Sequence, residues 1–324
     1  MSDKITILGC GRWASFHAWY QSTVLKNKVL VWGRRDGFYE EIASTHKNQY
    51  VTLPKSVEFT NDLDAAIKFS KYIIISISAQ AMPEFSAEIA KCNPQNRVFI
   101  LAMKGIIDQT GERLSEVLKS HIDASNDITV WVGPGHVQDF VAGQPNIMII
   151  DGYDAKVVDD VANKFKSKLA RLYQGDDLIG VEIGAAAKNV IGIMAGICDG
   201  AGLNSLKGAL MARGVYEVAK LIVAMGGKQL TAYGMSHLGD YEATLFSKNG
   251  HNRLYGEKLY KGEATDGFLA EGVPTTKAIY DLAKKYNVEM PICGLCYQIL
   301  YEKKDPDEGL VELLTRGHAR EFRF

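Results

Sequence analysis

A glycine-containing loop near the start of the chain has the residue types and spacing to bind a phosphate-bearing ligand. Gly9 and Gly11 follow directly on an apolar run, and the loop reads Gly9-Cys10-Gly11-Arg12-Trp13-Ala14 before a helix-like stretch. Glycine permits a tight turn and lets backbone N–H groups approach a pyrophosphate at a helix N-terminus. Two glycines alone are a weak signal, because Ala14 fills the third fingerprint position and small residues also occur in ordinary turns. The predicted dinucleotide-binding residues are Gly9, Gly11, Arg12, Trp13 and Ala14.

The residues after the second apolar run bear on the choice of dinucleotide. The sequence there is Gly33-Arg34-Arg35-Asp36. An NAD-binding protein usually offers an acidic residue to the ribose hydroxyls at this point, whereas arginines suit a 2′-phosphate. Arg34 and Arg35 therefore predict a preference for NADP(H), and Asp36 leaves NAD(H) open as a second cofactor. The alternative is that both arginines belong to a solvated turn.

Lys188 is the candidate acid/base residue. It is the only charged residue between Ile183 and Cys198. Moving a hydride between a carbinol carbon and a nicotinamide also requires a proton to leave or reach the oxygen. Desolvation in such an apolar segment lowers the pKa of a lysine toward neutrality, unless the side chain extends to the surface. Asn189 is a candidate donor to a substrate oxygen, and Asp240, in a turn-like Gly-Asp pair, a candidate to orient the lysine.

Short β-branched runs in the first half indicate the strands that position these residues. Runs at 5–8, 28–32, 72–77, 98–101 and 128–132 read as strands separated by amphipathic helices, and 146–150 extends the set. The runs are nearly continuous in apolar residues, as expected when helices cover both faces of a sheet. We therefore expect an α/β fold with an N-terminal Rossmann domain built on a doubly wound, mostly parallel sheet.

The second half carries a helical pattern. From about residue 177 the strand signal stops, and stretches rich in Ala, Leu, Ile and Met cover 181–225 and 275–300. We expect a dinucleotide-binding Rossmann domain at 1–178 and an all-helical substrate and catalytic domain at 179–324. Because no repeat or low-complexity tract is visible, the boundary is expected to be a strand-to-helix junction rather than a flexible tether.

The composition favours a small-molecule partner. The chain has 324 residues and a formal net charge of -1, which gives no sequence-wide attraction to nucleic acid or to an anionic membrane. No uncharged apolar run reaches the roughly 18 residues of a membrane span, and the start is not signal-like, so a cytoplasmic protein is expected. The five cysteines form no disulfide framework. Cys293 and Cys296 are expected to pack in a core rather than to bind metal, and no metal site is predicted.

With these residues in place, the chain resembles the bacterial-type NAD(P)-dependent glycerol-3-phosphate dehydrogenases over nearly its whole length and in the same order. The matching pieces are Gly9-Cys10-Gly11-Arg12-Trp13-Ala14, Lys104-Gly105-Ile106, Gly133-Pro134-Gly135, Val181-Glu182 through Lys188-Asn189-Val190, Arg213-Gly214, Gly239-Asp240, Asn252-Arg253 and Glu271-Gly272-Val273.

The resemblance implies reversible reduction of dihydroxyacetone phosphate to sn-glycerol 3-phosphate, with Lys188 as proton donor and acceptor and Asp240 beside it. It also suggests a homodimer. The expected substrate-binding residues are Lys104, Gly133, Gly135, Asn189, Thr244, His251 and Asn252. Further residues expected beside the cofactor are Lys104, Val137, Arg253 and Glu271.

Two departures from the family pattern leave the substrate open. Gly-Pro-Ser-Phe-Ala of the family is Gly133-Pro134-Gly135-His136-Val137 here, so a serine hydroxyl is missing, and His136 is a candidate to replace the polar contact. Ser-Arg-Asn of the family is Gly250-His251-Asn252, so a titratable ring replaces a permanently charged fork.

Three interpretations follow for the second departure. His251 binds a phosphate when protonated, Arg253 substitutes for the missing arginine, or the substrate is another small phosphorylated or carboxylated alcohol. A different class of function, a non-catalytic NAD(P)-binding sensor, is also open. The retention of four residues argues against it: Lys188, Asn189, Asp240 and Asn252.

Overall fold

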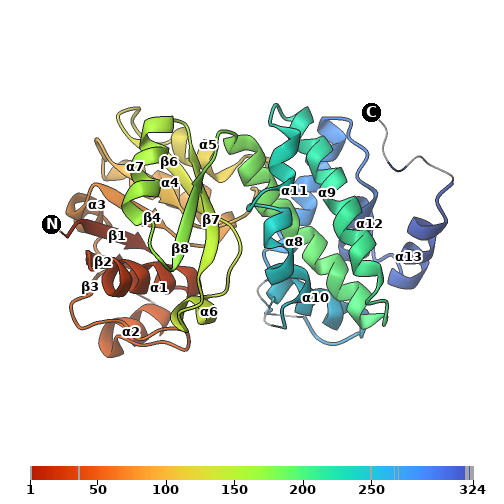
Figure 1. The fold of residues 1–324 in the computed structure, drawn as a ribbon, viewed down its shortest axis with the longest axis horizontal. Coiled ribbons are helices and arrows are strands. Elements are labelled where there is room, and N and C mark those ends of the chain that lie inside the picture. Colours follow the sequence, from red (N-terminus) through yellow and green to blue (C-terminus); the bar gives the residue numbers. More distant parts are fainter. Residues whose placement is uncertain are drawn as a thin grey trace.

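The protein consists of a sheet half and a helical half (Figure 1). The structure, a computed structural model, describes residues 2–35, 37–248, 250–265, 267–268, 270–317 and 321. Within this part, eight strands form one sheet in the order β3-β2-β1-β4-β5-β6-β7-β8. The strands are β1 (Lys4–Leu8), β2 (Lys28–Trp32), β3 (Glu58–Thr60), β4 (Tyr72–Ile75), β5 (Val98–Leu101), β6 (Asp127–Val132), β7 (Asn146–Gly152) and β8 (Ala170–Gln174).

Helices cover both faces of the sheet because its central strands are apolar on both sides. Ile74 of β4 packs into one core cluster with residues of α1, α6 and α7, whereas Ile73 and Ile75 pack into another with residues of α3, α4 and α5. This division follows the alternation of side chains along a strand. The helices of this half are α1 (Arg12–Trp19), α2 (Gly37–Thr45), α3 (Leu63–Phe69), α4 (Met82–Lys91), α5 (Leu114–Lys119), α6 (Val137–Val141) and α7 (Ala155–Phe165).

The predicted doubly wound, mostly parallel sheet is confirmed, with two strands that the sequence did not indicate. β7 runs antiparallel to β6, and the remaining pairs of neighbouring strands are parallel. The unpredicted strands, β3 and β8, lie at the two edges of the sheet. β3 has three residues and β8 is largely exposed, so neither carries the apolar run that marks a buried strand.

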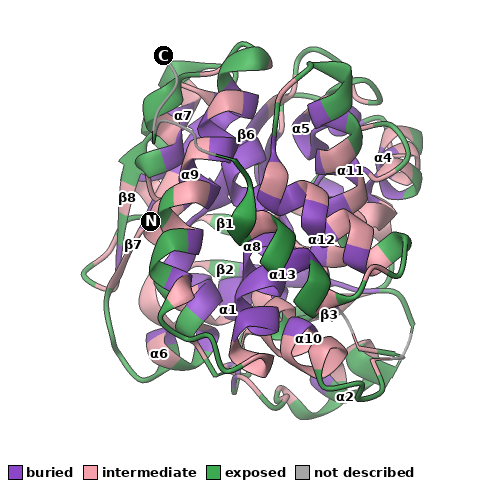
Figure 2. Ribbon diagram, turned by 90° about the vertical axis from the view of Figure 1, so that its right-hand side faces the viewer, coloured by how far each residue is buried: buried purple, intermediate pink, exposed green. Residues whose placement is uncertain are grey.

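The second half is helical, as expected, and is organised around α8 (Leu178–Gly200). Most of α8 is buried, and its burial is visible at the centre of Figure 2. The continuous pattern expected over 181–225 is divided, because a turn at 201–205 separates α8 from the next helix. The other helices are α9 (Leu206–Ala224), α10 (His251–Tyr260), α11 (Gly272–Lys285), α12 (Pro291–Tyr301) and α13 (Pro306–Thr315).

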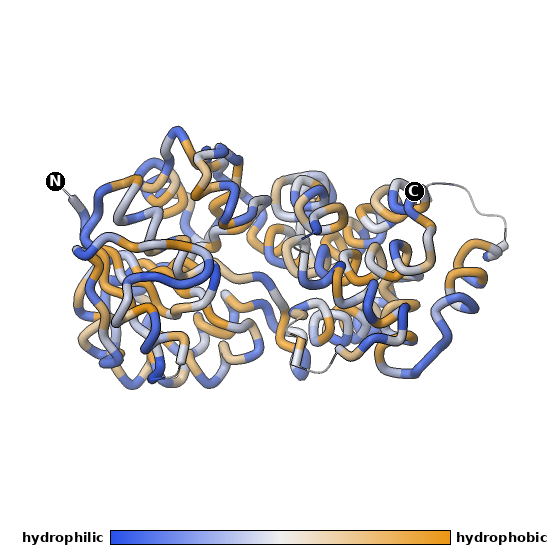
Figure 3. Tube along the Cα trace, turned by 90° about the horizontal axis from the view of Figure 1, so that it is seen from below, coloured by the Kyte–Doolittle hydropathy of each residue, from blue (hydrophilic) through white to orange (hydrophobic). Residues whose placement is uncertain are grey.

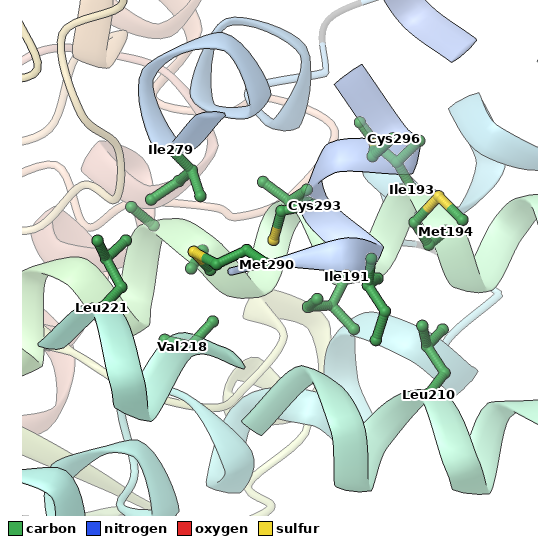
Figure 4. Close-up of a cluster of buried hydrophobic side chains, with 14 of the residues drawn as sticks. Ile191, Ile193, Met194, Leu210, Val218, Leu221, Ile279, Met290, Cys293 and Cys296 are labelled. Atoms are coloured by element: carbon green, nitrogen blue, oxygen red, sulfur yellow. The ribbon is translucent and has the colours of Figure 1, made fainter. Parts of the chain in front are cut away.

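The core of the helical half contains the paired cysteines. Figure 4 shows Cys293 and Cys296 of α12 among side chains such as Ile191, Met194 and Val218. Both cysteines are at most 1% exposed. Burial raises the pKa of Cys296 to about 12, so this thiol stays protonated. The two residues pack in the core as expected from the sequence.

Two glycines bring α8 and α10 into backbone contact. A Cβ on Gly196 would lie 1.9 Å from the carbonyl oxygen of Arg253, and a Cβ on Gly256 would lie 2.0 Å from that of Ile193. Any larger residue would therefore force the two helices apart. This contact places the first residues of α10, His251 and Asn252, beside the middle of α8.

One helix of the described residues, α8, is long and apolar enough to cross a membrane, but 94% of its most apolar window is buried inside the protein. In the hydropathy view, apolar segments run through the interior of both halves (Figure 3). α8 is thus the core helix of its half.

Candidate active site

A cavity of about 950 Å³ lies where the sheet half meets the helical half. It opens at the carboxyl ends of β1, β2 and β4. The strand order changes direction between β1 and β4, which are parallel, because β2 and β3 lie on one side of β1 and the later strands on the other. Open parallel sheets bind their ligands at this point. The predicted site residues that line the cavity are Gly9, Gly11, Arg12, Trp13, Arg34, Lys104, Gly135, Lys188, Asn189, Asp240, Thr244, His251, Asn252 and Glu271.

The glycine loop fits a dinucleotide. Gly9 has a φ of +122°, and a Cβ there would lie 2.2 Å from the carbonyl oxygen of Ser76, so only glycine is accommodated. Gly11 is the N-cap of α1, has no side-chain cap, and has open space where a Cβ would be. Backbone N–H groups at this helix end are therefore accessible to a pyrophosphate. Ala14 is fully buried, which explains why a small residue follows.

Arg12 extends the loop toward the neighbouring segments. Its guanidinium donates to Gln138 Oε1 at 3.0 Å and lies 5.5 Å from the centre of the Tyr50 ring. Burial lowers the pKa of Arg12, while Tyr50 and Asp139 oppose this shift. Within the described residues its Nε atom is buried without a hydrogen-bond partner. The side chain is thus placed to meet a negatively charged group in the cavity.

The two arginines after β2 have different surroundings. Arg34 lines the cavity and forms an ion pair with Glu88 at 2.7 Å. Arg35 is exposed and lies outside the cavity lining, and its guanidinium meets the Asn61 side-chain oxygen when that amide is oriented to accept. Asp36, the residue that leaves NAD(H) open, falls outside the described residues.

Lys188 lies at the centre of a buried network of charges. Its Nζ donates to Thr244 Oγ1 at 2.7 Å and lies 3.1 Å from Asp240 Oδ2. The same carboxylate oxygen is 2.5 Å from Lys104 Nζ, which also donates to the carbonyl oxygen of Gly133 at 2.8 Å. One carboxylate is therefore shared by two ammonium groups.

The pKa of Lys188 is lowered to about 8 in these surroundings. Burial is the largest cause, because it disfavours the charged form, and the charge of Lys104 acts in the same direction. Asp240 opposes both effects. Near pH 8 the amine is consequently present in both protonation states, as an acid/base group requires.

A buried histidine fixes the turn that carries Asp240. His237 contacts the Gly184 carbonyl oxygen through Nδ1 at 2.8 Å and the Tyr241 hydroxyl through Nε2 at 2.7 Å. Burial lowers its pKa to about 4, so the ring stays neutral. It thereby ties the short helical turn Leu238–Asp240 to α8, four residues before Lys188.

Further residues join the helical half to the cofactor side. Asn252 Oδ1 accepts from the Gly272 backbone N–H at 2.9 Å, which aligns the start of α11. Burial raises the pKa of Glu271, while hydrogen bonds from Ser78 and the Ala79 backbone oppose this shift. Glu271 thus reaches across the cavity to the residues after β4.

The family departures are divided between the cavity and its surroundings. His136 and His251 line the cavity. Burial lowers the pKa of His136, and the charge of Arg12 adds to this effect. Arg253 lies elsewhere, because its guanidinium pairs with Asp199 at 2.7 Å and Glu257 at 2.9 Å. The other predicted site residues outside the cavity lining are Gly133, Ala14, Arg35 and Val137.

Sequence reasoning missed several wall residues of the cavity, among them two continuous segments. One is the segment 76–78, which follows β4, and the other is the loop 48–50. The apolar run over 72–77 was read as strand to its end, but β4 ends at Ile75 and the next residues turn toward the glycine loop. The rule that ligands bind beyond the carboxyl ends of strands at a switch point would have indicated 76–78. The loop 48–50 carries no such signal.

A second cavity of about 1020 Å³ lies within the helical half between α9, α12 and α13. Its buried acid, Glu217, accepts the backbone N–H groups of Ile292 and Cys293 and thereby caps α12. Among the described residues, no group of three or more His, Cys, Asp and Glu side chains could hold a metal ion. The Lys188 cavity is therefore the candidate active site.

Comparison with curated proteins finds relatives along the whole chain. Glycerol-3-phosphate dehydrogenase [NAD(P)+] from Thermoanaerobacter sp. (strain X514) is 35% identical, and the alignment covers 98% of this chain and 99% of the relative. The protein of the same name from Chlorobium phaeobacteroides (strain BS1) is 32% identical, over 99% of this chain and 100% of the relative.

Solved structures of dehydrogenases share the fold of this chain. The crystal structure of glycerol-3-phosphate dehydrogenase from Coxiella burnetii has a TM-score of 0.90 at 27% identity, over 97% of this chain and 99% of that chain. A D-mandelate dehydrogenase with NADH, at a TM-score of 0.60 and 16% identity, shares the fold.

Family models account for both halves. The model of the NAD-dependent glycerol-3-phosphate dehydrogenase N-terminus matches residues 4–158, and that of the C-terminus matches residues 177–311. The chain therefore belongs to the NAD-dependent glycerol-3-phosphate dehydrogenase family.

Proposed function

We propose that the protein catalyses the reversible reduction of dihydroxyacetone phosphate to sn-glycerol 3-phosphate with NADPH, and with NADH as a second cofactor. The observation that carries the proposal is the buried amine of Lys188, held 3.1 Å from Asp240 and 2.7 Å from Thr244 in a cavity that also contains the glycine loop. The names of the curated relatives support the same reaction.

The proton moves through Lys188. When bound, the nicotinamide supplies or accepts the hydride. In the reducing direction the ammonium form of Lys188 donates a proton to the carbonyl oxygen, and in the oxidising direction the neutral amine accepts the hydroxyl proton. Asp240 orients the amine and offsets the two positive charges around it. Gly133 holds Lys104 against the same carboxylate through its carbonyl oxygen.

The substrate lies between the strand ends and α10 in this proposal. Lys104 and Lys188 come from the two halves, and Asn189 provides an amide beside the amine. Thr244, Asn252 and Gly135 complete the wall. His251, the first residue of α10, takes the place of the family arginine beside the substrate phosphate.

The cofactor spans the cavity from the glycine loop to the residues after β2. Arg34, which lines the cavity, contacts the 2′-phosphate, and Arg35, which is exposed beside it, adds positive charge nearby. Glu271 borders the nicotinamide end. Val137 and Arg253 lie outside the cavity lining and act indirectly. Val137 packs in the core behind the cavity, and Arg253 holds α10 to α8 through Asp199.

The proposal extends to the organisation of the protein. The cofactor domain spans 1–178 and the helical domain 179–324, since α8 begins at Leu178. We also propose a cytoplasmic homodimer, following the family resemblance. The partner is a small molecule, in keeping with a dehydrogenase family.

A second candidate is the oxidation of another small phosphorylated or carboxylated alcohol. The observation that favours it is the placement of Arg253, whose guanidinium is engaged by Asp199 and Glu257 rather than directed into the cavity. His251 therefore lines the substrate side of the cavity, whereas Arg253 does not. The sensor interpretation is disfavoured, because the Lys188 network has the geometry of an acid/base site.

A substrate panel tests the proposal. The purified protein is assayed with dihydroxyacetone phosphate and either NADPH or NADH, beside other phosphorylated and carboxylated hydroxy-ketones. We expect the highest kcat/KM with dihydroxyacetone phosphate and NADPH. If this substrate is not turned over with either cofactor, the first proposal is rejected, and turnover of another compound selects the second.

A further inference from the structure

Two carboxylates of α4 lie beside Arg34 at the end of the cavity. Arg34 NH2 is 2.7 Å from Glu88 Oε1 and 3.6 Å from Glu84 Oε1. Arg34 lines the cavity, whereas neither glutamate does. The arginine thus lies between the cavity and a pair of acidic side chains.

The position of these carboxylates is fixed by the core. Phe85, between them on α4, is 1% exposed and stacks on Trp32 of β2 with the ring centres 5.0 Å apart. Trp32 comes two residues before Arg34. The strand end that carries the arginine and the helix that carries the glutamates are therefore joined through a buried aromatic pair. Glu84 and Glu88, four residues apart, lie on one face of the helix.

We infer that Glu88 is a positioning residue that sets the cofactor preference through Arg34. Its carboxylate holds the Arg34 guanidinium and, by its negative charge, weakens the attraction of that guanidinium for a 2′-phosphate. The inference rests on the proposed function, specifically on the assignment of Arg34 to the 2′-phosphate. NADH carries a neutral hydroxyl in place of the 2′-phosphate and is therefore much less sensitive to this negative charge. The carboxylate therefore reduces the difference in affinity between NADPH and NADH, so that NADH remains usable as a cofactor.

The contact with Glu88 weakens the attraction of Arg34 for a second anion. An arginine paired with a carboxylate is a neutral unit, so an approaching phosphate must compete for the guanidinium with an anion already in place. The pair is only partly buried, with side-chain exposures of 53% for Arg34 and 32% for Glu88, so solvent screens it. A change of a few-fold in affinity is the expected scale.

The test is the ratio of two dissociation constants measured by fluorescence or calorimetry, without turnover. Glu88→Gln keeps the shape and an oxygen acceptor for Arg34 but removes the charge. We expect NADPH to bind about two- to fivefold more tightly and NADH to bind as before. The gain should shrink in high salt, because exposed charges are screened. Glu84→Gln should act in the same direction but less, given its longer distance.

A matched control separates a local effect from a change in net charge. Asp176→Asn removes one carboxylate from an exposed ion pair with Lys228, beyond the opposite edge strand β8. It should change neither constant. Unchanged or weakened NADPH binding in Glu88→Gln overturns the inference, as does an equal gain for NADH, which would indicate a general change in the site.

Arg34→Ala separates the role of Arg34 in binding the 2′-phosphate from the role of Glu88. Loss of NADPH affinity with NADH affinity retained supports the role of Arg34 in cofactor selection. If this variant loses NADPH affinity while Glu88→Gln changes nothing, the inference about Glu88 alone is wrong. If Arg34→Ala leaves the ratio of the two constants unchanged, the assignment of Arg34 to the 2′-phosphate is wrong.

Discussion

At the scale of single residues, the chemistry depends on the setting of Lys188 rather than on the lysine alone. A solvated lysine is almost wholly protonated at neutral pH. Burial and the nearby Lys104 lower the pKa of Lys188 to about 8, and Asp240 prevents a larger decrease. The same amine can therefore donate a proton in one direction and accept one in the other.

The pH dependence of turnover should report this group. Oxidation of sn-glycerol 3-phosphate needs the neutral amine, so kcat/KM should rise as the pH increases through about 8 and then level off. Reduction of dihydroxyacetone phosphate needs the ammonium form and should decline over the same range. Initial rates from pH 6 to 10 in both directions check this prediction. Two parallel profiles would contradict it.

Asp240→Asn should shift that profile. The carboxylate raises the pKa of Lys188, so its removal should move the rise in the oxidation rate to lower pH. It also leaves two ammonium groups without their shared partner, and the free energy of unfolding should fall by roughly 3 kcal/mol. The pH profile and urea unfolding measure the two effects. A profile that stays in place would show that Asp240 does not act on Lys188.

The sequence predicted Lys188 with Asp240 beside it, but it did not predict that Lys104 shares the same carboxylate. A single charge in a long apolar segment is visible in one dimension, and so is a glycine loop after a strand. Lys104 and Asp240 are 136 positions apart in the chain, and only the packing of the two halves brings them to 2.5 Å. Arg253 was predicted to lie beside the cofactor, but its guanidinium pairs with Asp199, and nothing in the sequence indicates that contact.

At the scale of elements, the site depends on how closely α10 approaches α8. Lys188 and Asn189 belong to α8, and His251 and Asn252 begin α10. Their separation is set by the backbone contact at Gly196. The sequence shows this glycine only as an interruption of an apolar helix, so the contact could not be predicted. The break between α8 and α9 was missed because the apolar pattern resumes beyond it, although Gly202, Asn204 and Ser205 are turn-forming residues.

Gly196→Ala should loosen the contact. The added methyl group meets the Arg253 carbonyl oxygen and should destabilise the fold by about 2 kcal/mol. Displacement of α10 should raise the KM for dihydroxyacetone phosphate more than the KM for NADPH. Gly208→Ala is the matched control, because this exposed residue of α9 has open space at the Cβ position. It should stabilise the helix by up to about 1 kcal/mol. Equal effects of the two substitutions would contradict the role of the contact.

At the scale of the whole molecule, buried and part-buried ion pairs join the two halves. One is Lys104–Asp240 in the site, and another is Arg113–Glu182 at 2.7 Å, which links the start of α5 to α8. Both partners of the second pair are at most 7% exposed. Glu182 also accepts from the Ser115 backbone N–H at 3.0 Å. These contacts hold α8 of the helical half against the sheet half.

Arg113→Met should weaken this connection. Glu182 would remain buried without its cation, and the free energy of unfolding should fall by roughly 3 kcal/mol. Arg316→Met removes an arginine from an exposed pair with Glu289 and should cost no more than about 1 kcal/mol. Urea unfolding of both variants checks the comparison. A loss no larger for Arg113 than for Arg316 would show that the buried pair contributes little.

The most direct test of the central claim is turnover of Lys188→Ala. The purified variant is compared with the wild-type protein in the reduction of dihydroxyacetone phosphate with NADPH, with folding checked by circular dichroism and cofactor binding by fluorescence. The account predicts a decrease in kcat of about 10²- to 10⁴-fold with NADPH binding retained. A folded variant that turns over as fast as the wild-type protein would contradict the assignment of Lys188 as the acid/base group.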